Sequence, residues 1–281
     1  MTVTASFLDT TVLVNLSNQE EPAHTDSQTF VDNHQPCEVA YYASREMLAG
    51  PIGNICTAHN LLLASNNHAE ALLAIERRFP SRSREQTRLE LLRDLQSIFA
   101  SDKPGTGGDH KREGLQAIKI RATQLWRRAN NPKGVARVQT LACFNSGDLS
   151  LAASGELRGP NDSFACHENE RCSAAAYLYD DPVTLTQMID ALHPSRLDDK
   201  AKVKRENSGR RRALRELKKD GPERFHKGRC RALGDAYFVA MCPKQSVIAT
   251  TNLVDFEPLC KVLGKQFSKC VIRAMTDRIP D

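Results

Sequence analysis

The sequence lacks the features of secreted and membrane-spanning chains. Its longest apolar stretches, such as Leu61-Leu62-Leu63-Ala64, are far shorter than the roughly 20 residues that a transmembrane helix needs. The first residues hold no basic segment and reach an acid at Asp9, which is not the pattern of a signal peptide. We therefore expect a cytoplasmic protein that does not bind membranes.

Aromatic residues and paired cysteines are also scarce. Aromatics make up 6% of the chain, and Trp126 is the single tryptophan. The nine cysteines are odd in number and scattered from Cys37 to Cys270, which argues against a disulfide framework and for reduced, mostly buried thiols. With 281 residues, of which 40% are hydrophobic, the chain is long enough for one large domain or two ordinary ones.

Charge is unevenly distributed, although the net charge is only +5. Residues 1–56 hold one base and seven acids, a net charge of −6, whereas residues 57–230 carry +9 and residues 231–281 carry +2. This pattern indicates a site that collects carboxylates beside a surface that attracts an anion, for which nucleic acid is the obvious candidate. A solvated basic helix face would explain the same charge.

Strands and helices alternate at both ends of the chain. We expect strands at residues 5–14 and 38–43, a helix at 231–242, and further strands at 246–250 and 268–273. The intervening segment reads as mainly helical, with helices expected at 54–79, 83–100, 111–130, 173–179, 183–192 and 196–219. The alternation predicts an α/β fold with a mostly parallel central sheet.

Single acids occur where these strands end or helices begin. Asp9 closes the first strand, Glu46 follows the second, Asp235 opens a helix and Asp255 follows the strand at 246–250. In an open parallel sheet, ligands gather outside the carboxyl ends of the strands, so the four acids are expected to converge. Clustered carboxylates repel one another unless a hard cation such as Mg²⁺ or Mn²⁺ neutralises them.

Four short motifs carry a resemblance to a known family. They are F-L-D-T-T-V-L-V-N-L at residues 7–16, S-R-E-M-L-A-G at 44–50, G-D-A-Y-F-V-A-M-C at 234–242 and A-T-T-N-L-V-D-F-E at 249–257. In this order they resemble the signatures of PIN-domain nucleases, which include the VapC-type toxins. The resemblance implies an α/β/α sandwich and a metal-dependent endoribonuclease. It places Asp9, Glu46, Asp235 and Asp255 as metal-binding catalytic acids, supported by Thr10, Thr251 and Asn252.

Each acid also has a purely structural interpretation. Asp9 would cap a turn at the end of a strand, Asp235 and Asp255 would cap helices, and Glu46 would be a solvated helix residue. The resemblance covers about 1–56 and 230–273, so we expect residues 1–56 and 230–281 to form the catalytic core. Residues 57–229 would then be an inserted, mostly helical and basic region, where compact family members have only two or three helices.

The insertion ends in a strongly basic stretch. Residues 200–231 hold fourteen bases and four acids, a net charge of +10, and lead directly into the helix that carries Asp235. A nucleic-acid backbone bound there would be guided toward the acids, and the candidate contacts are Arg210, Arg211, Arg212, Arg215 and Lys218. The alternative is a solvated helix. Trp126 would stack on a base or belong to the core.

A zinc site at Cys166, His167 and Cys172 is the less favoured interpretation of those residues. Structural zinc takes four ligands, commonly in paired C-x₂₋₄-C units, and the spacing here is irregular. Ordinary buried thiols explain the cysteines more simply.

The sequence thus favours a Mg²⁺- or Mn²⁺-dependent nuclease that cleaves RNA, in the role of a toxin or defence effector. Single-stranded DNA is the alternative substrate, and a PIN-fold protein that binds nucleic acid without cutting it is the alternative class. Whether an antitoxin or another partner protein exists, and whether the chain forms a homo-oligomer, stay open.

Overall fold

The computed structural model describes most of the chain in two compact units. The first, here called the sheet unit, comprises residues 1–46, 131–146 and 163–281, and the second, the helical unit, comprises 47–130 and 147–162. The residues described are 5–17, 23–47, 50, 52–66, 68–78, 110–138, 149–159, 172–193, 201–225 and 230–270.

The sheet unit is built on five parallel strands in the order β3-β2-β1-β6-β7. The central strand β1 is fully buried and pairs with β2 on one side and β6 on the other, with Leu8 opposite Val39 and Ala249. The strands are β1 (Ala5–Leu8), β2 (Cys37–Ala40), β3 (Val135–Val138), β6 (Ser246–Thr250) and β7 (Gln266–Lys269).

The strand order creates a switch point between β1 and β6. From β1 the chain proceeds outward to β2 and β3, and it then returns to the other side of β1 to form β6 and β7. In open parallel sheets, ligands bind in the crevice at the carboxyl ends of the two strands that flank such a reversal. Those ends are Leu8 and Thr250, beside the first and last acidic motifs.

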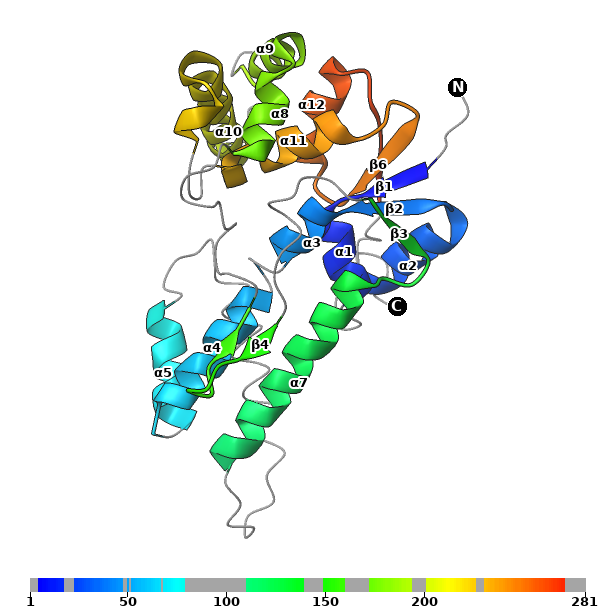
Figure 1. Cartoon of the computed structure of the whole chain (residues 1–281). Helices are drawn as coiled ribbons and strands as arrows, with labels where there is room; N and C mark the ends of the chain where they lie inside the picture. Colours follow the sequence, from blue (N-terminus) through cyan, green and yellow to red (C-terminus); the bar gives the residue numbers. More distant parts are fainter. Residues whose placement is uncertain are drawn as a thin grey trace, which may run out of the picture. The chain divides into compact units, whose positions relative to one another are not determined.

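Helices cover both faces of this sheet (Figure 1). Helices α1 (Thr10–Ser17) and α2 (His24–Asn33) lie on one face, and α11 (Gly234–Met241) and α12 (Leu253–Val262) lie on the other. Alternate side chains of β1 face the two layers. Leu8 joins a cluster with Val12 and Phe30, while the ring of Phe7 lies 4.8 Å from that of Phe238.

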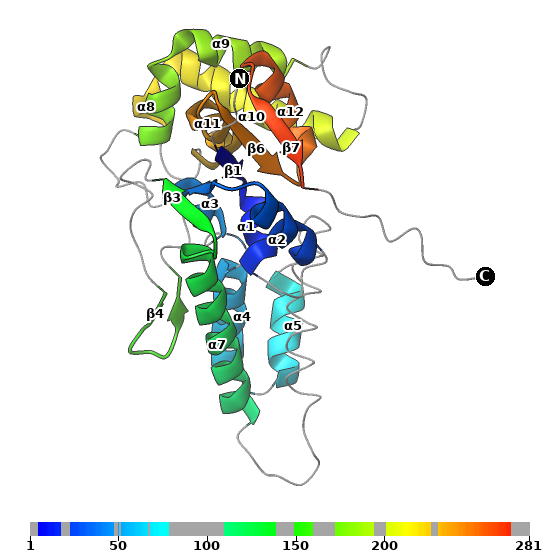
Figure 2. The same cartoon turned by 90° about the vertical axis from the view of Figure 1, so that its right-hand side faces the viewer.

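Three more helices pack on the side of α11 and α12 (Figure 2). They are α8 (Ser173–Tyr179), α9 (Pro182–Ala191) and α10 (Ala201–Asp220), which contact one another. Helix α8 packs against α11, and α9 and α10 pack against α12. Two short 3₁₀ turns, Pro222–Arg224 and Cys230–Leu233, lead from α10 toward α11. On β2's carboxyl side, α3 (Tyr41–Met47) begins directly after the strand. These elements bring basic α10 next to the helices that carry Asp235 and Asp255.

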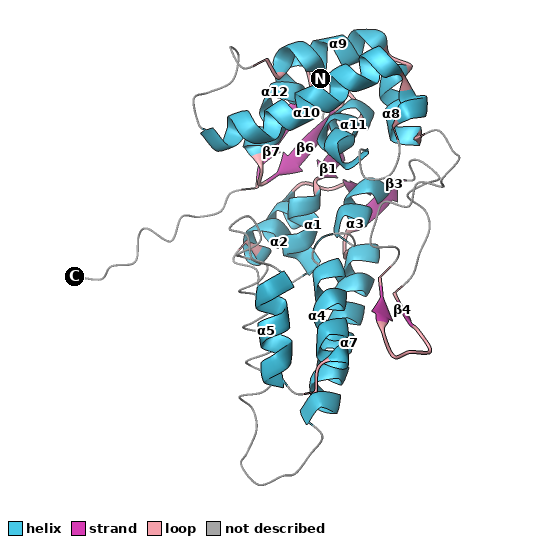
Figure 3. Ribbon diagram, turned by 90° about the vertical axis from the view of Figure 1, so that its left-hand side faces the viewer, coloured by secondary structure: helices cyan, strands magenta, loops and turns pink. Residues whose placement is uncertain are grey.

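The helical unit consists of three helices and a β-hairpin among its described residues (Figure 3). Helix α4 (Gly53–Ala64) packs against α5 (His68–Arg78) and α7 (His110–Asn130). The hairpin pairs β4 (Ser150–Leu151) with β5 (Leu157–Arg158), and the Asn60 side chain binds the backbone N–H and C=O of Leu157 at 2.8 and 3.1 Å. Trp126 on α7 is partly buried.

The α/β class and the mostly parallel central sheet agree with the sequence-based prediction, and several element boundaries differ. The strand expected at 5–14 ends at Leu8, because the Asp9 side chain accepts hydrogen bonds from Thr10 N and Thr11 N and starts a helix. The strand expected at 38–43 ends at Ala40, and the last one lies at 266–269 rather than 268–273. The helix expected at 83–100 lies outside the described residues.

The division into domains also differs from the predicted one. The sequence assigned 57–229 to an insertion, yet β3 is hydrogen-bonded to β2, and α8, α9 and α10 belong to the sheet unit. The separate helical unit is therefore the shorter set 47–130 and 147–162. Pairing between strands about a hundred residues apart leaves no local sequence signal, which explains the difference.

No helix among the described residues is long and apolar enough to cross a membrane.

Candidate active site

Asp9 lies at the carboxyl end of the central strand and is almost fully buried, with 3% exposure. Its Oδ1 accepts a hydrogen bond from Thr10 N at 2.6 Å. Its Oδ2 accepts bonds from Thr11 N at 3.3 Å and from Thr11 Oγ1 at 2.7 Å. The acid therefore does cap α1, as its structural interpretation supposed. A carboxylate has about four acceptor positions, so Oδ1 retains capacity for a further ligand.

Thr250, the last residue of β6, supplies a further hydrogen bond to Asp9. Its Oγ1 donates to Asp9 Oδ2 at 2.9 Å and accepts from Asn252 N at 2.9 Å. The strand register explains the contact, because Leu8 lies opposite Ala249 and the next residues are therefore neighbours. Sequence reasoning chose Thr251 for this supporting role. Thr251 contributes through its backbone N–H, which donates a hydrogen bond to Thr11 Oγ1 at 3.2 Å.

Glu46 is held by two hydroxyl groups. Thr10 Oγ1 donates to Glu46 Oε2 at 2.5 Å, and Tyr42 Oη donates to Oε1 at 2.6 Å. Tyr42 sits one helical turn before Glu46 on α3 and is 2% exposed. Its hydroxyl lies so close to the backbone of Gly234 that a Cβ at that position would overlap it. Gly234 thus allows Tyr42 to reach Glu46.

Asp235 and Asp255 share one cationic partner, Arg210 of α10. Arg210 Nη2 binds Asp235 Oδ2, and Nη1 lies 3.5 Å from Asp255 Oδ1. Asp255 Oδ2 also accepts a hydrogen bond of 2.5 Å from Asn252 Nδ2. Arg210 itself is braced by Asn207, whose Oδ1 accepts from Nη1 at 2.6 Å.

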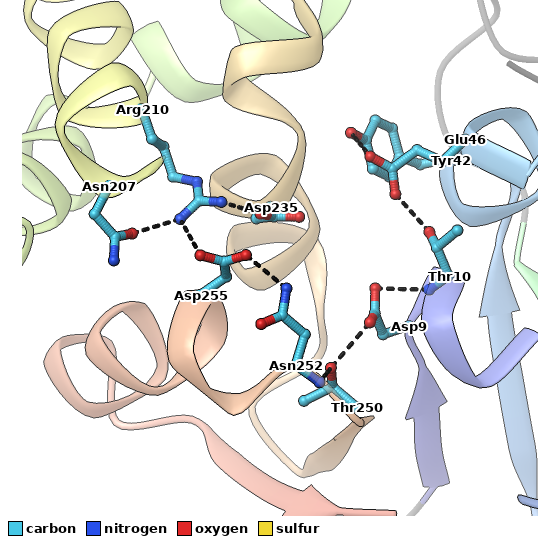
Figure 4. A network of polar contacts seen from close by, with 10 residues as sticks. All are labelled: Asp9, Thr10, Tyr42, Glu46, Asn207, Arg210, Asp235, Thr250, Asn252 and Asp255. Carbon is cyan, nitrogen blue, oxygen red and sulfur yellow. Dashed lines mark hydrogen bonds and ion pairs between the residues drawn. The ribbon is translucent and has the colours of Figure 1, made fainter. Parts of the chain in front are cut away.

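These contacts join all four predicted acids in one region (Figure 4). Glu46 is linked to Asp9 through Thr10, and Asp9 is linked to Asp255 through Thr250 and Asn252. Arg210 completes the chain to Asp235, which lies between Arg210 and the Asp9–Glu46 pair. The four acids come from four separate parts of the fold: the end of β1, α3, the start of α11 and the start of α12.

Burial and mutual repulsion raise the pKa of two of these acids. The pKa of Asp9 rises to about 6, mainly because burial disfavours the charged form and also because the charge of Asp235 opposes ionisation. The pKa of Glu46 rises to about 7 for the same two reasons. Hydrogen bonds from the threonine and tyrosine hydroxyls act in the opposite direction but are the smaller effect. Buried Asp9 and partly buried Glu46 are therefore repelled by Asp235 when all three acids are ionised.

The donor set suits a hard cation in its chemistry. Carboxylate oxygens are what Mg²⁺ and Mn²⁺ prefer, and a cation near Asp9, Glu46 and Asp235 would relieve the repulsion that raises the two pKa values. Within the described parts of the chain, however, no three His, Cys, Asp or Glu side chains are grouped closely enough to hold a metal ion. Arg210 supplies the positive charge at Asp235 and Asp255 instead.

The other basic residues predicted to bind nucleic acid lie on a different side of α10. Arg211, Arg212, Arg215 and Lys218 line a pocket of about 640 Å³ between α9 and α10, to which Lys219 also contributes. Arg211 Nε donates to Ile189 O at 3.1 Å, and Lys218 Nζ donates to Thr186 Oγ1 at 2.8 Å. Arg210 departs from the expectation, because its side chain is 10% exposed and turned toward the acids.

Sequence reasoning missed four residues of this region and did not anticipate that Arg210 contacts Asp235 and Asp255. Asn207, Tyr42, Thr11 and Thr250 all contact a predicted site residue. The doubled threonines at 10–11 and 250–251 were a usable signal, because both hydroxyls of the first pair and the Thr250 hydroxyl of the second donate to an acid. Nothing local distinguishes Arg210 from Arg211 and Arg212.

The structure describes one of the three residues of the zinc interpretation. Cys172 is a buried free thiol at the start of α8. Cys166 and His167 lie outside the described residues.

Comparisons with protein-family models, curated proteins and solved structures found no match to this chain.

Proposed function

We propose that the chain is a metal-dependent nuclease that hydrolyses phosphodiester bonds in RNA. The observation that carries the proposal is the joining of Asp9, Glu46, Asp235 and Asp255 by hydrogen bonds and ion pairs at the carboxyl ends of β1 and β6. Bringing four acids from distant parts of the sequence together costs free energy, because their charges repel, unless a positively charged group binds them. The four motifs that resemble those of PIN-domain nucleases support the same interpretation.

Asp9, Glu46 and Asp235, with Asp255 beside them, would hold a Mg²⁺ or Mn²⁺ ion. Such an ion supplies Lewis acidity toward a phosphate oxygen and a more acidic bound water. The chain's own residues orient this site. Thr10 and Tyr42 fix the two oxygens of Glu46, and Thr11 and Thr250 fix Asp9 Oδ2.

The basic pocket between α9 and α10 is the proposed contact for the nucleic-acid backbone. Its five basic side chains outnumber its two acids, Asp190 and Glu216. Arginine and lysine bind phosphate oxygens without regard to base sequence, so this pocket would add affinity rather than sequence specificity. A toxin or defence role, with an inhibitory partner protein, would fit such a general activity.

A non-cleaving nucleic-acid-binding protein is the second candidate, and Arg210 is the observation that favours it. An arginine that already neutralises Asp235 and Asp255 can stabilise the acids without any metal ion. In that case the basic pocket would bind nucleic acid, and the four acids would only stabilise the fold.

A cleavage assay on labelled RNA and single-stranded DNA, with Mg²⁺, Mn²⁺ or EDTA, tests the proposal. We expect RNA cleavage that EDTA abolishes and that falls by about two orders of magnitude or more in Asp9→Asn and Asp235→Asn. The matched control is Glu257→Gln, an acid on the same helix as Asp255 that pairs with Lys261 at 2.6 Å, and it should cleave normally. Binding without cleavage would favour the second candidate, and cleavage of DNA alone would correct the substrate.

A further inference from the structure

Arg210 is a well-enclosed positive charge in the candidate site. Its side chain is 10% exposed, as is that of Asp255, and that of Asp235 is 21% exposed. A guanidinium removed from water in this way is strongly tied to its carboxylate partners, because the effective dielectric constant is low. An exposed surface arginine would be bound much less strongly to its carboxylate partners, because water screens the charges.

The sequence of α10 builds this arrangement. Asn207 and Arg210 are three residues apart and therefore lie on the same face of the helix. Asn207 is fully buried and accepts a hydrogen bond from Arg210 at 2.6 Å, while its Nδ2 has no partner among the described residues. Burying an incompletely satisfied amide costs free energy, and here that amide holds the guanidinium of Arg210 in place.

A divalent cation and this arginine would use the same carboxylates. Asp235 lies between Arg210 and the Asp9–Glu46 pair, so a cation held by these acids would contact the same carboxylate as the arginine. Arg210 binds the same acid through Nη2. Two positive groups at one carboxylate repel each other, and a cation near Asp235 would have to weaken or break the contact with Arg210.

We infer that Arg210 is an internal counter-ion that competes with a divalent cation for Asp235 and Asp255. This inference rests on the proposed function, because it concerns the cation of that same site. The arginine determines the affinity of the site for its ion. While Arg210 binds Asp235, that carboxylate is engaged, so ion binding must first break the Arg210–Asp235 contact. Loss of the arginine's charge therefore strengthens ion binding.

Mn²⁺ binding measured by calorimetry, without nucleic acid, tests the inference. Arg210→Gln should bind Mn²⁺ at least about tenfold more tightly than the unaltered protein, since one unit of repelling charge is gone. Arg210→Lys keeps the charge and should stay within about threefold of the unaltered protein. Arg211→Gln is the matched control, because it removes the same charge from the next residue, whose side chain lines the pocket between α9 and α10, and it should change the affinity little.

A second measurement uses the unaltered protein and so does not depend on whether Arg210→Gln folds. In NMR spectra, saturating Mg²⁺ should move the guanidinium signals of Arg210 toward those of exposed arginines. Unmoved signals would overturn the inference. Equal or weaker Mn²⁺ binding by a folded Arg210→Gln variant would also overturn it, the weaker case meaning that the arginine orients Asp235 for the ion. Absence of cleavage, with tighter Mn²⁺ binding in the variant, would refute the nuclease proposal alone.

Discussion

Gly234 and Tyr42 are in direct contact, with the tyrosine hydroxyl occupying the place where any other residue at position 234 would carry its Cβ. The contact joins the start of α11 to α3, and through the same hydroxyl Tyr42 donates to Glu46 Oε1 at 2.6 Å. The glycine directly before Asp235 thus determines the position of another acid of the site, Glu46.

Gly234→Ala should therefore push Tyr42 away from Glu46 and destabilise the fold by about 1–3 kcal/mol, the usual effect of overfilling a packed region. Urea unfolding measures the change in stability. Gly209→Ala on α10 is the matched control, because no atom lies within 4 Å of its future Cβ, and it should be neutral or slightly stabilising. Equal stability of both variants would contradict the role given to Gly234.

The stability of the ion-free protein should fall as the pH rises from about 4 to about 7. In the folded chain Asp9 and Glu46 have pKa values of about 6 and 7, above their ordinary values of 3.8 and 4.5, so the folded state binds more protons than the unfolded state in this interval. The stabilisation is complete below the unfolded pKa values and is lost as the pH passes the folded ones.

Asp9→Asn removes one of these two groups and should flatten the pH dependence. In EDTA at pH 8 the variant should be more stable than the unaltered protein by about 1–3 kcal/mol, since a shift of about two units in the pKa of Asp9 corresponds to roughly that energy. At pH 4 the two proteins should be nearly equal. Urea unfolding at pH 4, 6 and 8 provides the measurement, and parallel curves would show that Asp9 ionises normally.

Thr250→Val should be more damaging than Thr251→Val, although the two threonines are adjacent. Thr250 Oγ1 donates to Asp9 and accepts from Asn252 N, so its removal takes one partner from a buried carboxylate and one from a backbone N–H. We expect a cost of about 2 kcal/mol or more for Thr250→Val and about 0.5 kcal/mol or less for Thr251→Val. Thermal or urea unfolding of the pair decides this, and the reverse order would contradict the assigned hydrogen bonds.

The basic pocket predicts a salt-dependent interaction with RNA. Replacing Arg212 and Arg215 by Ala should lower the affinity and reduce the slope of log K against log salt by about 0.7 for each phosphate that is no longer neutralised. Filter binding between about 50 and 200 mM salt measures the slope. Arg112→Ala with Arg127→Ala, on α7 of the helical unit, removes the same charge and should leave the slope unchanged. An unchanged slope in the pocket variant would assign these arginines to solvent or to a protein partner.

Elements with strong local signals could be predicted from the amino-acid sequence alone. The strand at 246–250 lies where predicted, and the helix expected at 231–242 covers Gly234–Met241, after a 3₁₀ turn at Cys230–Leu233. Both could be found because a hydrophobic helical face, a following proline and a β-branched run are local features. The first strand was predicted too long, since Thr10, Thr11 and Val12 favour strands in isolation. The cap that Asp9 provides overrides that preference.

The order of the four acids along the chain could be predicted from the sequence, but the residues that contact each acid in the fold could not. Parallel pairing of β1 with β6 brings Asp9 next to Thr250, across 241 residues of chain. The membership of β3 and α8–α10 in the sheet unit depends on similar long-range contacts. Three consecutive arginines look identical in sequence, but a helix turns each by about 100°. Only the packing of α10 against α12 and the turn before α11 decides that Arg210 meets the acids while Arg211 and Arg212 line the pocket.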